Sequence, residues 1–310
     1  MTVDNNKNLC QICVISVLIS YFCPPKNIYY YMYQPKYPYS EAEIAQRIED
    51  CARHVIQNYD EQTLYRLMLN LIDLTTLEGT DTPQRIEQLC QQAIAFADEA
   101  RNIAPPAAVC VYSPFVAQAK KLLQGMPIKV ATVACAFPSG QTPLALKLEE
   151  VKYAVEVGAD EIDMVISRGK FLSGALQEVF DEIAAVREIC AHNTLKVILE
   201  TGELGNADNI YKASLLAIEA GADFIKTSTG KIAESATPRS VMIMADAIQH
   251  WYERTQKQVG LKPSGGLSDV HSACLFIQII DKIVGTEWLN NRFLRLGTSR
   301  FANVLAQKIS

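Results

Sequence analysis

The stretch "LKVILETGELGNADNIYKASLLAIEAGADFIKTSTGK" (195–231) contains one complete strand–helix–strand unit. Two short apolar runs, "LKVILE" (195–200) and "DFIKTST" (223–229), predict buried strands. Between them, "NIYKASLLAIEAG" (209–221) has apolar residues three and four positions apart, a spacing typical of an amphipathic helix. Because strands that alternate with helices pair in parallel, this stretch predicts an α/β fold with a parallel sheet.

The same unit repeats along most of the chain. Helices are predicted before the first strand (41–69), after it (83–100) and at the end of the chain (301–307). Eight such units over about 270 residues match a closed (β/α)8, or TIM, barrel, which has about 250 residues. An open doubly wound sheet is the competing architecture, but no GxGxxG motif opens a helix and no linker interrupts the repeat. The eight strand candidates are 71–77, 107–112, 128–135, 161–166, 195–200, 223–229, 260–266 and 292–299.

Composition and charge limit the classes of partner. The net charge of −5 and the pI near 5.5, with no basic stripe, argue against a nucleic-acid surface. The nine cysteines are scattered, several inside apolar runs, which indicates reduced thiols of a cytoplasmic protein rather than a disulfide framework. All four histidines fall in helical or helix-edge segments, so a strand-end metal site would lack imidazole ligands. With no dinucleotide motif either, we expect neither a metal nor a nicotinamide cofactor.

The first 40 residues differ from the rest. "LCQICVISVLISYFC" (9–23) is mostly apolar but too short for a comfortable membrane span, so we expect no membrane partner. It resembles the hydrophobic region of a signal peptide, yet a single preceding lysine and no clear cleavage site weaken that interpretation. Its "CQIC" (10–13) has zinc-site spacing without a second ligand pair. We favour a poorly packed extension over 1–40, or a start at Met32, followed by a barrel domain over 41–310.

Polar residues late in the strands are the candidates for chemistry, because (β/α)8 barrels place their active sites at the carboxyl ends of the strands. "ADFIKTSTGK" (222–231) puts Lys226 in the middle of an otherwise buried run. Alternation along the strand groups Lys226 with Phe224, and we predict that this face points into the lumen. Lys262 then lies on the neighbouring strand and Asp163 two strands away.

Two buried lysines with one aspartate carry an excess of positive charge. Burial and a nearby cation both disfavour a protonated amine. We therefore expect the pKa of Lys226 to fall well below its usual value of about 10.4, with Lys262 as the cation. A neutral amine at this position can attack a carbonyl group and form a Schiff base. A purely structural ion-pair network is the alternative, and it explains one buried lysine better than two.

Small residues follow the last two strands. "KPSGG" (262–266) and "GTS" (297–299) each precede a predicted helix, which places backbone amides near helix N-termini. Barrels of this kind often bind phosphate after strands seven and eight. The sequence therefore predicts a phosphate site between these two turns.

Six motifs, in order and spacing, resemble the deoxyribose-phosphate aldolase family from about residue 65 to the C-terminus. They are "LIDLTTL" (71–77), "EIDMVI" (161–166), "KVILETGEL" (196–204), "ADFIKTSTGK" (222–231), "KPSGG" (262–266) and "LGTS" (296–299). The resemblance implies a (β/α)8 barrel and the reversible cleavage of 2-deoxy-D-ribose 5-phosphate to glyceraldehyde 3-phosphate and acetaldehyde. It also implies that no metal or organic cofactor takes part.

The resemblance assigns roles to individual residues as well. Lys226 would form the Schiff base, Lys262 would perturb its pKa and aid proton transfer, and Asp163 would move protons together with an activated water. The other matched positions would line the pocket (Asp73, Thr229 and Lys231) or bind phosphate (Gly265, Gly266, Gly297 and Ser299).

The sequence departs from the family pattern in two places. Arg300 stands where many members have a second small residue, so it either reinforces phosphate binding or points outward. The chain ends in "AQKIS" (306–310), without the final tyrosine that helps proton exchange in some members.

Two alternatives stay open, a transaldolase-like Schiff-base aldolase and a sugar-phosphate-binding barrel without catalysis. For the leading interpretation we expect a phosphorylated sugar as substrate, a cytoplasmic location and a homodimer.

Overall fold

The computed structural model describes residues 36–57 and 59–309. The apolar run at 9–23, its CxxC pair and Met32 lie outside these residues. Neighbouring strands in the sheet all pair in parallel, which confirms the predicted parallel α/β fold. The strands are β1 (Ile72–Thr75), β2 (Ala108–Val111), β3 (Lys129–Ala134), β4 (Glu161–Val165), β5 (Thr194–Ile198), β6 (Phe224–Lys226), β7 (Gly260–Lys262) and β8 (Leu296–Thr298).

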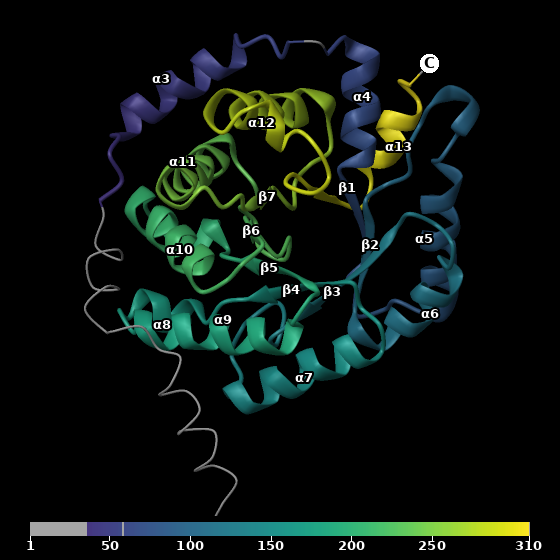
Figure 1. Cartoon of the computed structure of the whole chain (residues 1–310), viewed down its shortest axis with the longest axis horizontal. Coiled ribbons are helices and arrows are strands. Elements are labelled where there is room, and N and C mark those ends of the chain that lie inside the picture. Colours follow the sequence, from purple (N-terminus) through teal and green to yellow (C-terminus); the bar gives the residue numbers. More distant parts are fainter. Residues whose placement is uncertain (1–35, 58, 310) are drawn as a thin grey trace, which may run out of the picture. The chain divides into compact units, whose positions relative to one another are not determined.

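Helices surround the strands as an outer ring (Figure 1). Their order along the chain follows the order of the strands, so each strand is followed by one or two helices before the next strand begins. The described helices are α3 (Glu41–Ala52), α4 (Glu61–Asn70), α5 (Pro83–Ala95), α6 (Val116–Leu122), α7 (Leu144–Glu156), α8 (Arg168–Leu172), α9 (Leu176–Cys190), α10 (Ala207–Glu219), α11 (Pro238–Thr255), α12 (Val270–Ile283) and α13 (Phe301–Ala306).

The sheet closes into a barrel between β7 and β8. The strands follow the order β7-β6-β5-β4-β3-β2-β1-β8. At the seam, the amide of Leu261 donates to the carbonyl of Phe293 at 2.9 Å, and the amide of Gly297 donates to that of Pro263 at 2.9 Å. Parallel bridges join the same two segments. The architecture is therefore the predicted (β/α)8 barrel.

The predicted helix over 41–69 is wrong, because two helices occupy this range. The first, α3, ends at Ala52 with Arg53 as its C-cap. The second, α4, begins after Asp60, whose side chain accepts a hydrogen bond from the amide of Thr63 at 2.7 Å. An aspartate at an N-cap satisfies a free amide of the first turn, and this favours a new helix start. Ile56, in the connection, is buried.

Strands β6 and β7 are shorter than the sequence predicts. The predicted strand 223–229 ends at Lys226, and the predicted strand 260–266 ends at Lys262. Beyond these points a side chain joins the two segments: the hydroxyl of Thr227 accepts a hydrogen bond from the amide of Ser264 at 3.0 Å. Both lysines are therefore the last residues of their strands, the position at which barrel active sites lie.

Residues 36–40 pack on the barrel ahead of α3. Tyr37 is buried, its amide donates to Asp208 of α10 at 2.7 Å, and its hydroxyl bonds to Asp246 of α11. Arg47 of α3 donates to the same Asp246 carboxylate at 2.7 Å through each of two nitrogens. Within the described residues, no helix is long and apolar enough to cross a membrane.

Candidate active site

Lys226 carries its amine into the lumen of the barrel, as predicted. The residue is 2% exposed. Its Nζ lies 2.8 Å from Oδ2 of Asp163, on β4, and Nζ of Lys262, on β7, lies 2.7 Å from the same oxygen. Side chains from three strands can meet in this way only on the inner face of the barrel. The structure thus brings together the three residues that the sequence put forward for catalysis.

Further charged groups lie around this trio. Lys196 Nζ, from β5, is 2.8 Å from Oδ1 of Asp163 and 2.5 Å from Oε2 of Glu161. Arg295, just before β8, places Nη1 2.6 Å from Oδ1 of Asp73 and Nη2 2.8 Å from Oε1 of Glu161. A single buried network of ion pairs therefore connects the inner faces of β1, β4, β5, β6, β7 and the start of β8.

The network has one positive charge too many when every member is ionised. It contains four cations, Lys196, Lys226, Lys262 and Arg295, and three carboxylates, Asp73, Glu161 and Asp163. Unbalanced charge in a buried site is costly, so the release of one proton balances the network. The amine that loses its proton at least cost is the one with the weakest support from carboxylates.

That amine is Lys226. Burial lowers its pKa, and the nearby ammonium of Lys262 lowers it further, while Asp163 opposes both. Lys262 behaves in the opposite way: its burial would lower its pKa, but Asp163 and Asp73 outweigh this and raise it. The pKa of Asp163 is held well below its usual range, because three lysines outweigh the effect of its burial. The site thus lowers the pKa of Lys226 and raises that of Lys262, in the direction that the sequence predicts.

Two members of the network, Lys196 and Arg295, were not singled out from the sequence. Lys196 carried a usable signal, since "LKVILE" places a lysine in an apolar strand just as "DFIKTST" does. The signal for Arg295 was weaker, because β8 begins only at Leu296 and the arginine belongs to the preceding loop. Glu161 lies in the motif "EIDMVI", two positions before Asp163, but was given no role.

The predicted pocket residues occupy two levels. Asp73 is fully buried within the network, where Lys262 Nζ lies 2.5 Å from its Oδ2. Thr229 and Lys231 follow β6 at the mouth of the barrel. Thr229 is 5% exposed, and the amine of Lys231 lies 2.9 Å from Oε1 of Glu78, in the segment after β1. Asp73 therefore acts on the lysines, while Thr229 and Lys231 lie beyond Lys226, the last residue of β6.

The two glycines after β7 form a tight turn. Gly265 and Gly266 have positive φ values of 78° and 71°, which glycine adopts at little cost. The amide of Gly265 donates to the carbonyl of Gly297 at 3.2 Å, so the turn lies against β8. The helix that follows is already capped, because Asp269 accepts from the amide of Ser272 at 2.9 Å. The carboxylate of Asp269 therefore already engages the N-terminus of α12, and the amide of Gly265 is engaged by Gly297.

Gly297 and the residues after it complete this end of the barrel. A Cβ at Gly297 would lie 2.3 Å from Oγ of Ser264 and 3.2 Å from Cε of Lys262, so glycine is required by close packing. Ser299 and Arg300 are both exposed, and the Arg300 side chain has no hydrogen-bond or ion-pair partner between residues 59 and 309. Its guanidinium is therefore available to a ligand.

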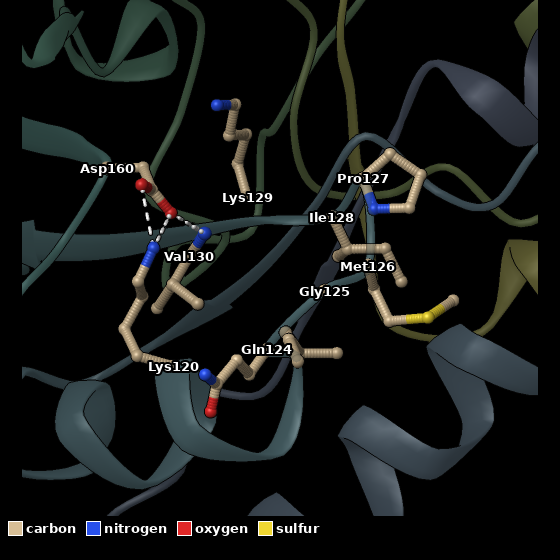
Figure 2. Close-up of a pocket in the computed structure, with 10 residues that line it drawn as sticks. Lys120, Gln124, Gly125, Met126, Pro127, Ile128, Lys129, Val130 and Asp160 are labelled. Atoms are coloured by element: carbon tan, nitrogen blue, oxygen red, sulfur yellow. Dashed lines mark hydrogen bonds and ion pairs between the residues drawn. The ribbon is translucent and has the colours of Figure 1, made fainter.

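A surface pocket of about 270 Å³ lies at the opposite end of the barrel, where β3 and β4 begin. Figure 2 shows Lys120 of α6 directed at Asp160, with both carboxylate oxygens 2.8 Å from its amine. Asp160 also accepts from the amide of Val130 at 2.8 Å. This ion pair ties a helix to the start of two strands and is far from the lysine network.

The fold and the network define a (β/α)8-barrel protein with a buried lysine of lowered pKa at the carboxyl ends of its strands. The family model of the DeoC/LacD aldolases matches residues 67–285. Human deoxyribose-phosphate aldolase is 41% identical over 251 residues, which cover 78% of this chain and 79% of the human protein. The cattle enzyme of the same name is 43% identical over 238 residues, covering 74% and 75%.

Among solved structures, deoxyribose phosphate aldolase from Aeropyrum pernix, described as a unique tetramer, superposes with a TM-score of 0.63. The match covers 87% of this chain and 98% of that one at 23% identity, which supports the fold alone. The chain belongs to the DeoC/LacD family of aldolases, and within it to the deoxyribose-phosphate aldolases. The family predicted from the six motifs is thus confirmed.

Proposed function

We propose that this aldolase reversibly cleaves 2-deoxy-D-ribose 5-phosphate to D-glyceraldehyde 3-phosphate and acetaldehyde through a Schiff base on Lys226. The observation that carries the proposal is the pairing of Lys226 with Lys262 on one oxygen of Asp163, at 2.8 and 2.7 Å, with the pKa of Lys226 lowered. A neutral, buried amine is the nucleophile that carbinolamine formation requires.

The first half of the reaction forms the covalent intermediate. The Lys226 amine attacks the aldehyde carbon of the open-chain sugar, and the carbinolamine loses water to give a protonated Schiff base. A proton has to reach the departing hydroxyl group. Lys262, which stays charged, and Asp163, which contacts both lysines, are placed to move it together with water.

The second half breaks and makes the carbon bonds. The proton of the sugar C3 hydroxyl leaves, the C2–C3 bond breaks towards the iminium, and glyceraldehyde 3-phosphate departs. The enamine left on Lys226 takes up a proton at C2, and water then releases acetaldehyde and the free amine. The positive iminium takes the place of the absent ammonium charge, and the three carboxylates of the network stabilise it.

Substrate binding follows from the mouth of the barrel. We assign the sugar hydroxyls to Thr229 and Lys231, which lie just beyond the nucleophile. We assign the phosphate to the turn of Gly265 and Gly266 and to Gly297 and Ser299, with the unpaired Arg300 as a further cation. Asp73 forms an ion pair with Lys262 and contributes to the pocket through that contact.

The alternatives fit the site less well. A transaldolase-like enzyme needs one reactive lysine and has no use for a second, charged lysine on the neighbouring strand. A barrel that only binds sugar phosphates would gain nothing from burying an excess positive charge, which costs stability.

Reduction of the Schiff base tests the proposal. Incubation with acetaldehyde and borohydride is expected to leave an ethyl group on Lys226, found by peptide mapping. Cleavage of the sugar phosphate is measured in parallel through the release of glyceraldehyde 3-phosphate. Lys226→Ala is expected to lose both signals, with turnover reduced by about 10³-fold or more. An alkylated Lys226 without turnover would favour the transaldolase-like alternative, and turnover by Lys226→Ala would end the Schiff-base mechanism.

Domain organisation, location and assembly complete the proposal. We propose that residues 41–310 form the catalytic domain, in the cytoplasm and as a homodimer. Reduced thiols support the location, since all six described cysteines are free and five are buried. Two exposed apolar side chains, Leu146 and Tyr153, lie on the same face of α7 about two turns apart and support self-association. Light scattering on the purified protein measures the assembly directly.

A further inference from the structure

Glu200 is a buried carboxylate that the proposed reaction does not use. It follows β5 and precedes the 3-10 turn at Thr201–Glu203, and it is 0% exposed. Its backbone is left-handed, with φ 57° and ψ 62°. Both the burial of a carboxylate and a left-handed conformation in a residue other than glycine are unfavourable, so its contacts must compensate.

Those contacts are made with the segment that follows the proposed nucleophile. Oε1 of Glu200 accepts from the amide of Thr229 at 3.1 Å, and Oε2 accepts from the hydroxyl of Thr229 at 2.5 Å. Nη1 of Arg168 lies 3.8 Å from Oε2 on the other side. The main chains are joined as well, because the amide of Thr201 donates to the carbonyl of Thr227 at 2.9 Å.

The bond fixes the polarity of the Thr229 hydroxyl. Burial raises the pKa of Glu200, while the hydrogen bonds from Thr229 and the guanidinium of Arg168 oppose this and favour the ionised carboxylate. An ionised carboxylate can only accept hydrogen bonds, so the hydroxyl proton of Thr229 is directed at Glu200. The oxygen of the same hydroxyl accepts from the amide of Lys231 at 3.1 Å. A hydroxyl oxygen has two lone pairs, so one acceptor position remains and no donor does.

We propose that Glu200 is a positioning residue that makes Thr229 a hydrogen-bond acceptor and thereby selects a sugar hydroxyl as its ligand. The inference rests on the proposed function, because it concerns how that substrate is recognised. A ligand group that can donate a hydrogen bond, such as a hydroxyl, gains a partner at Thr229. An ether or carbonyl oxygen at the same place cannot donate, so it faces a lone pair of the Thr229 oxygen without forming a hydrogen bond. Glu200 touches no substrate atom and acts through Thr229.

The substitution Glu200→Gln tests this polarity. Gln has almost the same shape, and its carbonyl can still accept from the Thr229 amide, but its NH2 group would donate towards the hydroxyl oxygen. That donation occupies the free lone pair, so kcat/KM for 2-deoxyribose 5-phosphate is expected to fall about tenfold, the loss of one hydrogen bond. Acetaldehyde carries no hydroxyl, so its rate of borohydride trapping on Lys226 is expected to stay within about twofold.

Control variants separate positioning from stability. Glu203→Gln, whose side chain is 42% exposed and contacts Arg168 at 2.6 Å without touching Thr229, is expected to match the wild type in both assays. Glu200→Asp keeps the charge and should recover part of the loss. In a Thr229→Val background, Glu200→Gln should have no further effect, because its only route to the substrate is gone.

The outcomes are distinct. If Glu200→Gln leaves kcat/KM for the sugar phosphate unchanged, or lowers acetaldehyde trapping to the same extent, the inference is wrong while the Schiff base stands. Additive losses in the double variant would also overturn it. If Glu200→Gln fails to fold, Glu200→Asp and Thr229→Val are compared in the same two assays, and equal losses in both assays contradict the inference. If the wild type neither traps acetaldehyde at Lys226 nor cleaves the sugar phosphate, the proposed function fails instead.

Discussion

Lys226 and Lys262 are register partners on adjacent strands, and both amines donate to a single oxygen, Oδ2 of Asp163, at 2.8 and 2.7 Å. Two ammonium groups that share one acceptor atom repel each other strongly in a buried site. Lys262 has a second carboxylate, Asp73, at 2.5 Å, whereas Lys226 pairs with Asp163 alone among residues 36–57 and 59–309. The pKa of Lys226 is therefore lowered while that of Lys262 is raised, and the difference between two similar lysines comes from one aspartate.

The pH dependence of turnover should report this difference. The nucleophile is the neutral amine, so kcat/KM is expected to rise with pH through the pKa of Lys226, which lies below the usual value for lysine. In Lys262→Met the repelling ammonium is gone and both aspartates favour a protonated Lys226. The rise is therefore expected at a pH higher by about one unit or more, with kcat lowered by about 10²-fold or more.

Lys147→Met is the matched control for that profile. Lys147 is also a fully buried lysine, but it lies outside the lumen, where its amine contacts Glu182 at 3.0 Å and Ser167 at 2.6 Å. Its removal should lower stability without moving the pH at which kcat/KM rises. The same inflection in Lys262→Met and in the wild type would show that Lys262 does not set the pKa of Lys226.

Gly297→Ala is expected to disturb the lysine pair through packing alone. The added methyl would lie 2.3 Å from Oγ of Ser264 and 3.2 Å from Cε of Lys262, so at least one of the two side chains has to move. A displacement near 1 Å can cost about 10²-fold in rate, and we expect a loss in kcat of roughly 10- to 100-fold. Gly79→Ala, whose added carbon has no described atom within 4 Å beyond the two neighbouring residues, should keep full activity. Equal kcat values in the two variants would contradict this account.

The ion pair between Glu78 and Lys231, 2.9 Å long, should compete with substrate binding. The two residues follow different strands and meet at the mouth of the barrel, so a phosphorylated sugar that engages Lys231 has to displace Glu78. The pair is exposed, and such pairs contribute at most about 1 kcal/mol, which corresponds to a fivefold change in KM. Glu78→Gln is therefore expected to lower KM by about two- to fivefold with kcat unchanged.

A change of net charge alone could produce a similar effect by attracting an anion more strongly. Glu49→Gln on α3 makes the same change of charge at an exposed position and should leave KM as it is. The salt dependence provides a second check, since the advantage of Glu78→Gln should shrink at high ionic strength. A KM that falls equally in both variants would assign the effect to long-range charge.

The repeating strand and helix pattern predicted the barrel, because a parallel sheet covered by helices requires apolar runs that are visible in one sequence. It predicted Lys226, Lys262 and Asp163 for the same reason, since a charged residue inside an apolar strand is conspicuous. Lys196 carried this signal too but was not singled out, although it pairs with Asp163 in the structure. A single sequence does not show which side chains form ion pairs across the strands.

Arg295 shows why the rest could not be predicted. It bonds to Asp73, 222 positions away, and to Glu161, 134 positions away, and only the closure of the barrel brings them together. Helix boundaries were missed for a different reason: the break between α3 and α4 depends on a single capping aspartate inside a continuous amphipathic pattern. Glu200 was visible as the polar last residue of a predicted strand, yet its contact with Thr229 depends on a left-handed turn.

Arg295 should matter for stability more than any surface ion pair. Its side chain is 7% exposed, and its guanidinium lies 2.6 Å from Asp73 and 2.8 Å from Glu161. Arg295→Met leaves these two carboxylates with less compensation inside the barrel, and loss of one partner from a buried pair typically costs about 3–5 kcal/mol. The free energy of unfolding, measured in urea at neutral pH, is expected to fall by about this amount. Arg239→Met, which removes an exposed pair with Glu41 at 2.5 Å, should cost less than about 1 kcal/mol. Equal losses in the two variants would contradict this prediction, and would mean that water, or a proton taken up within the network, relieves the two buried carboxylates.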